Sequence, residues 1–124
     1  MSNPSILVVE DDVAVREALA AFLEGAGYRV VEAGDGAEAL RRLRVASAEV
    51  GLILLDLMMP VMSGWEFRAE QSKDPALAAI PVVVVTADIT AADKAAAVGA
   101  AGCLLKPIEL PELLDLVERY CAAD

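Results

Sequence analysis

The chain has 124 residues, of which 57% are hydrophobic, and a formal net charge of -10. This length fits one domain with a buried core, whereas the acidic balance argues against a direct nucleic-acid partner or an anionic membrane surface. No apolar run approaches the roughly 18 residues that a membrane-spanning helix needs. We expect a single domain over residues 1–124, without an output domain.

The residue types present also limit the chemistry. The chain contains no histidine, which removes the commonest general base and the usual nitrogen ligand of transition metals. Cys103 and Cys121 lack the spacing of a zinc site, and in a chain without a signal segment they indicate reduced thiols in the cytoplasm. Carboxylates, hydroxyls, lysine or a bound hard cation must therefore carry out any reaction.

Short apolar runs alternate with helical patterns in the first part of the chain. Ile6–Val9 predicts a strand, and apolar residues then recur at helical spacing over Val15–Ala26. Arg29–Glu32 predicts a second strand. Asp35 opens a pattern close to a capping box, which predicts a helix that ends near Ala46.

The same alternation continues after this helix. Val50–Leu55 predicts the third strand, and the next helix carries Trp65 and should end before Pro75. Val82–Val85 predicts the fourth strand.

The last part of the chain predicts two helices around one strand. Thr90–Val98 is rich in alanine, so it has good helix propensity but few large side chains to bury. Gly102–Leu105 predicts the fifth strand, and the final helix begins near Pro111. The inner stripe of that helix consists of Leu113, Leu114, Val117 and Cys121.

Four of the predicted strands end on polar residues. The first runs into Glu10 and Asp11, the third into Asp56, the fourth into Thr86 and the fifth into Lys106. Continuous apolar strands separated by helices favour a parallel sheet in an α/β fold, and ligands of such sheets bind outside the carboxyl ends of the strands. The polar residues lie at that edge.

These residue types suit phosphoryl chemistry. Gathering Glu10, Asp11 and Asp56 is costly unless a cation offsets their repulsion, and Mg²⁺ prefers such hard oxygen ligands. An aspartate can attack phosphorus to give an aspartyl phosphate while a metal ion and fixed donors stabilise the equatorial oxygens. Thr86 and Lys106 are suitable donors.

Along essentially its whole length the chain resembles the receiver domain of bacterial two-component response regulators, the CheY-like group. This resemblance implies a flavodoxin-like, doubly wound (βα)5 fold. Its five parallel strands lie in the order 2-1-3-4-5, with helices on both faces. The segments that carry the resemblance are Ile6–Asp12, Leu54–Pro60 with Gly64, Val85–Ala87 and Leu105–Pro107.

The resemblance also implies a set of metal ligands. It makes Asp11 and Asp56 direct ligands of Mg²⁺, with Glu10 acting on the ion through water and the backbone carbonyl of Met58 as a further ligand. The neighbouring Asp12 is read as the N-cap of the first helix rather than as a ligand.

The remaining roles follow by position. Asp56 is the implied phosphoacceptor, Thr86 the switch hydroxyl, and Lys106 the cation that pairs with Asp56 or its phosphate. The bond between Lys106 and Pro107 is expected to be cis.

The chain departs from the family at Cys103. Many members carry at this position the tyrosine or phenylalanine that takes part in the switch. Cys103 is interpreted either as a small buried residue or as a redox-active thiol.

The implied function is a step in signal transduction. The chain would take a phosphoryl group from a phosphohistidine on a sensor histidine kinase or a histidine phosphotransfer protein, as in a phosphorelay. It would then signal by contact with a downstream protein, with no direct nucleic-acid or membrane partner. This is a regulatory role rather than that of an enzyme, although the domain would support its own aspartyl phosphorylation and dephosphorylation.

Three alternatives differ from this interpretation. A pseudo-receiver would keep the fold as a protein-binding module without phosphorylation. Gly34–Ala39 matches the G-x-G-x-x-G/A dinucleotide pattern, although it follows the second predicted strand and also fits a turn with a helix cap. A haloacid-dehalogenase-like phosphatase would need a second acid where this chain has Met58.

Overall fold

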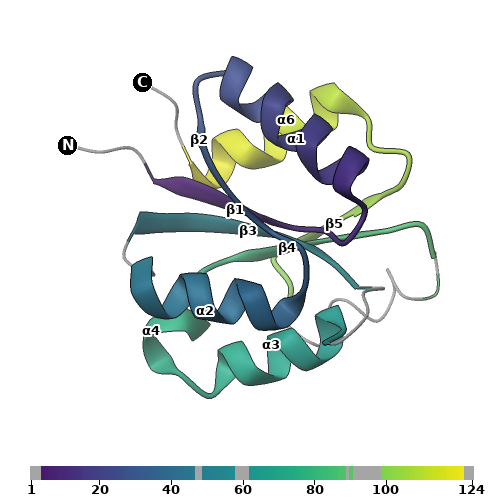
Figure 1. Cartoon of the computed structure of the whole chain (residues 1–124). Coiled ribbons are helices and arrows are strands. Elements are labelled where there is room, and N and C mark those ends of the chain that lie inside the picture. Colours follow the sequence, from purple (N-terminus) through teal and green to yellow (C-terminus); the bar gives the residue numbers. More distant parts are fainter. Residues whose placement is uncertain (1–3, 47–48, 58–61, 89, 91–98, 122–124) are drawn as a thin grey trace.

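A computed structural model describes residues 4–46, 49–57, 62–88, 90 and 99–121. A parallel sheet with the strand order β2-β1-β3-β4-β5 forms its centre (Figure 1). This confirms the predicted flavodoxin-like fold and the order 2-1-3-4-5. The strands are β1 (Ser5–Val9), β2 (Arg29–Ala33), β3 (Val50–Asp56), β4 (Val82–Thr86) and β5 (Gly102–Leu105).

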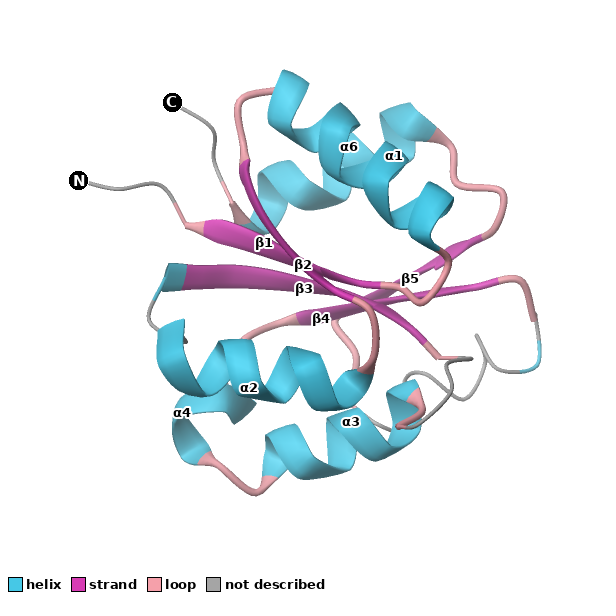
Figure 2. Cartoon of the chain, viewed as in Figure 1, coloured by secondary structure: helices cyan, strands magenta, loops and turns pink. Residues whose placement is uncertain are grey.

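Helices cover both faces of the sheet (Figure 2). α1 (Val13–Gly25) and α6 (Leu110–Tyr120) lie on one face. α2 (Gly36–Ala46), α3 (Gly64–Ser72) and α4 (Pro75–Ala78) lie on the other. Among the described residues, no helix is both long enough and apolar enough to cross a membrane.

The strands supply two hydrophobic cores, one for each face. Along β1, Ile6 and Val8 pack with α1 and α6, whereas Leu7 and Val9 pack with α2 and α3. Because both faces are covered, all four side chains are at most 1% exposed, which explains the continuous apolar run in the sequence. Burial of each such side chain contributes about 1.5–3 kcal/mol.

The helix that carries Trp65 ends at Ser72, before Pro75 as predicted. The short helix α4 was not predicted, because a proline after a helix is usually a stop signal and Pro75 here also starts a new turn. Asp74 accepts a hydrogen bond from the Ala76 amide at 3.0 Å, and Pro75 occupies an early helical position where its missing amide hydrogen is not needed. Leu77 from this turn is buried against the sheet.

The C-terminal helix begins at Leu110, next to the predicted Pro111. Leu113 and Val117 of its inner stripe are buried, Leu114 is half-buried, and Cys121 is buried immediately after the helix ends. The helix predicted over residues 90–98 lies outside the described residues except for Thr90.

Candidate functional site

Three carboxylates meet at the carboxyl ends of β1 and β3, as the sequence predicted. One carboxylate oxygen from each of Glu10, Asp11 and Asp56 lies within 4.8 Å of the other two. They come together because β1 and β3 are adjacent and parallel, with Val9 paired to Leu55 one residue before the acids begin. Glu10 and Asp56 are 2% and 5% exposed, whereas Asp11 is exposed to solvent.

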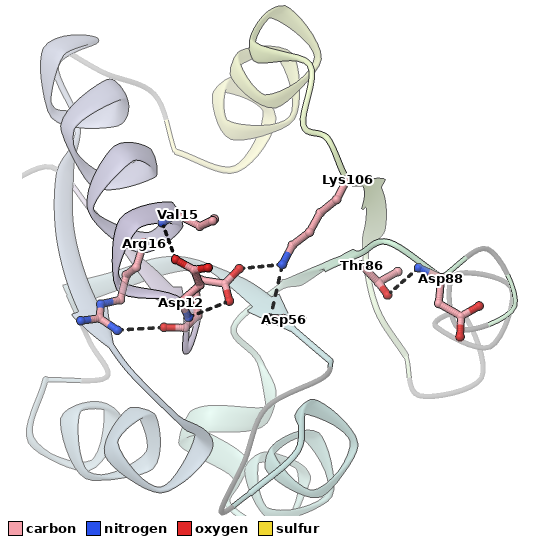
Figure 3. Close-up of polar contacts among 8 residues, drawn as sticks. Asp12, Val15, Arg16, Asp56, Thr86, Asp88 and Lys106 are labelled. Atoms are coloured by element: carbon pink, nitrogen blue, oxygen red, sulfur yellow. Dashed lines mark hydrogen bonds and ion pairs between the residues drawn. The ribbon is translucent and has the colours of Figure 1, made fainter.

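Lys106 reaches this cluster from the end of β5 (Figure 3). Its Nζ lies 2.7 Å from Oε1 of Glu10 and 3.6 Å from Oδ2 of Asp56. Partial burial alone would lower the pKa of Lys106, but the hydrogen bond that Lys106 donates to Glu10 and the negative charges of Asp56 and Glu10 outweigh it and raise the pKa above its usual 10.5. The ammonium group therefore stays charged between the two buried carboxylates.

The backbone around Lys106 fixes where its side chain starts. Its amide donates to the carbonyl of Thr86 at 2.9 Å, which ties the end of β5 to the end of β4. The following bond to Pro107 is cis, as predicted.

Thr86 is buried at the end of β4, with an exposed fraction of 1%. Its hydroxyl oxygen accepts a hydrogen bond from the Asp88 amide at 3.1 Å (Figure 3). A carboxylate oxygen of Asp88 accepts from the Thr90 amide at 2.8 Å. A hydroxyl that accepts one hydrogen bond still has its own proton to donate. Thr86 thus stands at the predicted edge of the sheet, and its donor capacity is not used by the Asp88 contact.

Arg16 also belongs to this region, although it was not among the predicted site residues. Its Nη1 donates to the backbone carbonyl of Glu10 at 2.9 Å, and its Nε pairs with Oε1 of Glu32 on β2 at 3.3 Å. A signal was available: a cation in the first turns of a helix is unfavourable with respect to the helix dipole and calls for a specific partner. The side chain of Arg16 is only 19% exposed.

Asp12 is the N-cap of α1, as the sequence indicated. Its side chain accepts a hydrogen bond from the Val15 amide at 3.1 Å (Figure 3). Its own amide donates to Oε2 of Glu10 at 3.2 Å. Asp12 therefore starts the helix and supports Glu10 through its backbone.

The segment after Asp56 packs tightly against the start of α3. The Gly64 amide donates to the carbonyl of Leu57 at 3.0 Å, and a Cβ on Gly64 would lie 2.7 Å from the carbonyl oxygen of Asp56. Only glycine allows this close approach without a shift of the backbone. Met58, the expected carbonyl ligand, lies outside the described residues.

The segment that matched the dinucleotide pattern forms a turn and a helix cap. Asp35 accepts a hydrogen bond from the Glu38 amide at 2.8 Å, as a capping residue does. The Glu38 carboxylate accepts from the Gly34 amide at 2.7 Å, one residue earlier than in a standard capping box. The segment follows β2 at the edge of the sheet, away from the position where a dinucleotide fold places its glycines.

Cys103 lies on β5 and is half-buried against the core beneath α2 and α3. Burial raises the pKa of its thiol above the usual 9.0, which disfavours the thiolate that a redox cysteine needs. Neither Cys103 nor Cys121 is in a disulfide. These observations favour the interpretation of Cys103 as a small packing residue.

Comparison with known proteins places the chain in a family. Residues 6–118 match the response regulator receiver domain family. The protein PilH of Pseudomonas aeruginosa is 31% identical over 94% of this chain and 97% of its own length. The probable transcriptional regulator ycf29 of Pyropia yezoensis is 34% identical over 96% of this chain, which spans only 54% of that relative.

Solved structures agree with this placement. The chemotaxis protein CheY4 of Vibrio cholerae is 31% identical, with a TM-score of 0.86 over 96% of this chain and 99% of CheY4. The receiver domain of the sensor histidine kinase PA1611 from Pseudomonas aeruginosa is 27% identical over 96% of this chain and 98% of its own, with the same TM-score, and was crystallised with magnesium in its active-site cleft. By sequence and by fold, the chain belongs to the response regulator receiver domain family.

Proposed function

We propose that the chain is a phosphoacceptor. It takes a phosphoryl group from a phosphohistidine donor onto Asp56 in the presence of Mg²⁺ and then changes its partner-binding surface. The main support is the setting of Asp56, a buried carboxylate with a lysine ammonium 3.6 Å away and two further carboxylates within 4.8 Å. A strand-end aspartate that served only as a helix cap would not need such neighbours.

The donor set fits Mg²⁺. Glu10, Asp11 and Asp56 offer hard oxygen ligands, and exposed Asp11 keeps one side of the cluster open to water. In our proposal Asp11 and Asp56 bind the ion directly, Glu10 acts through water and the Met58 carbonyl completes the protein ligands. When bound, the ion neutralises charge on the phosphoryl oxygens and holds them next to Asp56.

The chain's own residues divide the reaction between them. A carboxylate oxygen of Asp56 attacks phosphorus, the P–N bond of phosphohistidine breaks, and its electron pair stays on the imidazole nitrogen, which takes a proton from solvent. Lys106 donates to a phosphoryl oxygen and keeps its positive charge. Thr86 donates a hydrogen bond from its hydroxyl group to another phosphoryl oxygen, and this new contact starts the change at the surface.

The proposed partners follow from the same chemistry. The phosphoryl group comes from a sensor histidine kinase or a histidine phosphotransfer protein, and the signal leaves by contact with a downstream protein. The net charge of -10 supports protein partners over nucleic acid or an anionic membrane. The free thiols Cys103 and Cys121 support a reducing compartment, the cytoplasm. The role is regulatory, with the domain assisting its own phosphorylation and dephosphorylation.

Intact-mass measurement tests the proposal. Wild-type protein incubated with acetyl phosphate and Mg²⁺ should gain one phosphoryl group, and Asp56→Asn should gain none. Asp12→Asn is the matched control, because it removes a neighbouring carboxylate but keeps a good N-cap residue, and it should still be phosphorylated. Equal phosphorylation of Asp56→Asn would place the acceptor elsewhere. A folded wild-type protein that gained nothing would be a pseudo-receiver.

A further inference from the structure

A groove of about 430 Å³ lies between α2 and the edge strand β2, away from the carboxylate cluster. The two elements are joined by the short turn at Gly34 and Asp35 and lie next to each other (Figure 1). We call this hollow the β2–α2 groove. Its lining consists of Val31, Glu38, Arg41, Arg42, Val45 and Ala46.

Part of the groove is apolar and open to solvent. Val45 is 88% exposed, the highest value among the exposed large hydrophobic residues of the described chain. Val31 of β2 is half-buried beside it. A bound apolar side chain would cover both valines, and removal of their surface from water would favour binding.

The groove also carries positive charge that no ion pair among the described residues neutralises. Arg41 and Arg42 line it, and Arg44 is exposed on the same helix. Within the part of the chain that the structure describes, none of the three forms an ion pair. The chain has 20 acidic and only 10 basic residues, so three arginines without an acidic partner on one short helix are an unusual concentration of available cations.

The acid among the lining residues of the groove already holds a hydrogen bond. Glu38 lines the groove, but its carboxylate accepts a hydrogen bond from the Gly34 amide at 2.7 Å. A guanidinium group offers its donors in a fixed fork that matches a carboxylate. Arg41 and Arg42 can therefore donate hydrogen bonds to carboxylates of another protein.

The edge of the sheet adds a third feature. β2 pairs with β1 on one side and is the last strand of the sheet on the other. An edge strand can take up an extended segment of another chain through its backbone groups. The groove thus combines the edge of the sheet, two valines that solvent reaches, and two arginines that form no ion pair with any described residue.

We propose that the β2–α2 groove binds an extended acidic segment of a partner protein. Its carboxylates pair with Arg41 and Arg42, and an apolar side chain between them covers Val31 and Val45. The positive groove on a chain of net charge -10 is complementary to acidic protein surface. This proposal does not depend on phosphorylation of Asp56.

A titration followed by NMR tests the proposal. The probe is a short acetylated and amidated peptide in which glutamate alternates with leucine, added to the isotope-labelled chain. Amide signals of β2 and α2 should shift, and added salt should weaken binding because exposed charges are screened. The double variant Arg41→Gln/Arg42→Gln should lose affinity by about tenfold or more.

Two controls distinguish binding in this groove from non-specific electrostatic attraction between the peptide and the chain. Arg119→Gln removes an exposed cation from α6, on the other face of the sheet, and should bind the peptide as the wild type does. The double variant should keep the wild-type melting temperature and the wild-type spread of amide signals, which would show that the fold is intact. Signal shifts outside β2 and α2, equal binding by the double variant, or equal binding of a lysine–leucine peptide would each overturn the proposal. So would self-association of the wild type that the double variant abolishes, since the occupant would then be a second copy.

Discussion

At the scale of single residues, the contacts of Glu10 explain how a buried carboxylate keeps its position. Its amide donates to the carbonyl of Ala33 at 3.1 Å, and its own carbonyl accepts from Arg16 at 2.9 Å. Its two carboxylate oxygens accept from Lys106 and from the Asp12 amide. Both the backbone and the side chain of Glu10 are therefore held, which limits how far the acidic cluster can rearrange.

We predict that Arg16→Ala weakens Mg²⁺ binding by about tenfold, the scale at which loss of a supporting contact acts on a metal site. The variant frees the carbonyl of Glu10 and leaves Glu32 without its ion-pair partner. Titration calorimetry with Mg²⁺ measures the change. Arg16→Lys should recover part of the affinity, because lysine supplies the charge but not the two-point contact.

Arg119→Ala is the control for the loss of one positive charge, and it should bind Mg²⁺ with unchanged affinity. If Arg16→Ala lowered the melting temperature but left the Mg²⁺ affinity at the wild-type value, Arg16 would support the fold alone and not the site.

At the scale of elements, the junction of β3 with α3 is set by Gly64. We predict that Gly64→Ala destabilises the chain by roughly 1–3 kcal/mol, the usual cost of overpacking. Its Cβ would lie 2.7 Å from both the Asp56 carbonyl oxygen and Leu57 Cα, so backbone rather than a flexible side chain must move. Urea unfolding gives the free-energy change, and phosphorylation by acetyl phosphate should slow because Asp56 is displaced.

Gly25→Ala is the matched control, since a Cβ there meets nothing within 4 Å and the residue ends α1. It should be neutral or slightly stabilising because alanine has the higher helix propensity. Equal losses in the two variants would show that the contact at Gly64 does not limit the junction.

The elements also show what the sequence could and could not predict. The strands were predictable because burial on both faces requires continuous apolar runs such as Val82–Val85. α4 was missed because its single turn has no periodicity, and its cap at Asp74 becomes clear only once Leu77 is seen to be buried. The helix predicted over residues 90–98 falls mostly outside the described chain.

For the site, the sequence predicted which residues gather but not how they pair. Glu10, Asp56 and Lys106 could be placed at one edge because parallel strands end together. Lys106 approaches Glu10 at 2.7 Å and Asp56 at 3.6 Å. These distances depend on side-chain packing across the whole sheet, which the sequence does not reveal. The same is true of Arg16, whose partners lie on two different strand ends.

At the scale of the whole molecule, two buried groups should make the free energy of unfolding fall at high pH. Burial raises the pKa of Tyr28, with the charges of Glu118 and Cys121 adding to the effect, and burial raises the pKa of the Cys121 thiol. Such a group has a higher pKa in the folded state than in the unfolded state. Its contribution to the free energy of unfolding is fully present below the unfolded-state pKa and is lost as the pH rises through the folded-state pKa. The usual pKa values, which apply in the unfolded chain, are 9.0 for cysteine and 10.0 for tyrosine.

We predict that the free energy of unfolding is level between neutral pH and about pH 9 and falls above it. Lys106 acts in the same direction at still higher pH, because its raised pKa is above 10.5. Denaturant unfolding at a series of pH values measures the curve. Tyr28→Phe and Cys121→Ala should each flatten the alkaline fall, and an unchanged slope in both would trace it to other groups.

The last prediction concerns the effect of Mg²⁺ on the stability of the folded chain. A ligand that binds only the folded state stabilises it by mass action, by about 2.7 kcal/mol at one hundred times the dissociation constant. The carboxylates of Glu10, Asp11 and Asp56 come together only through the pairing of β1 with β3, so the site is absent from the unfolded chain. Thermal unfolding with increasing Mg²⁺ should therefore show a rising melting temperature.

Two neighbouring variants identify the ligand behind this effect. Asp11→Asn and Asp12→Asn each remove one negative charge from adjacent positions, but only Asp11 belongs to the cluster of carboxylates. Asparagine at position 12 still accepts the hydrogen bond from the Val15 amide that Asp12 accepts at 3.1 Å, so α1 keeps its cap. Asp11→Asn should lose most of the stabilisation by Mg²⁺, and Asp12→Asn should keep most of it. Similar losses in both variants would mean that Mg²⁺ responds to the net charge of this edge and that Asp11 is not a direct ligand.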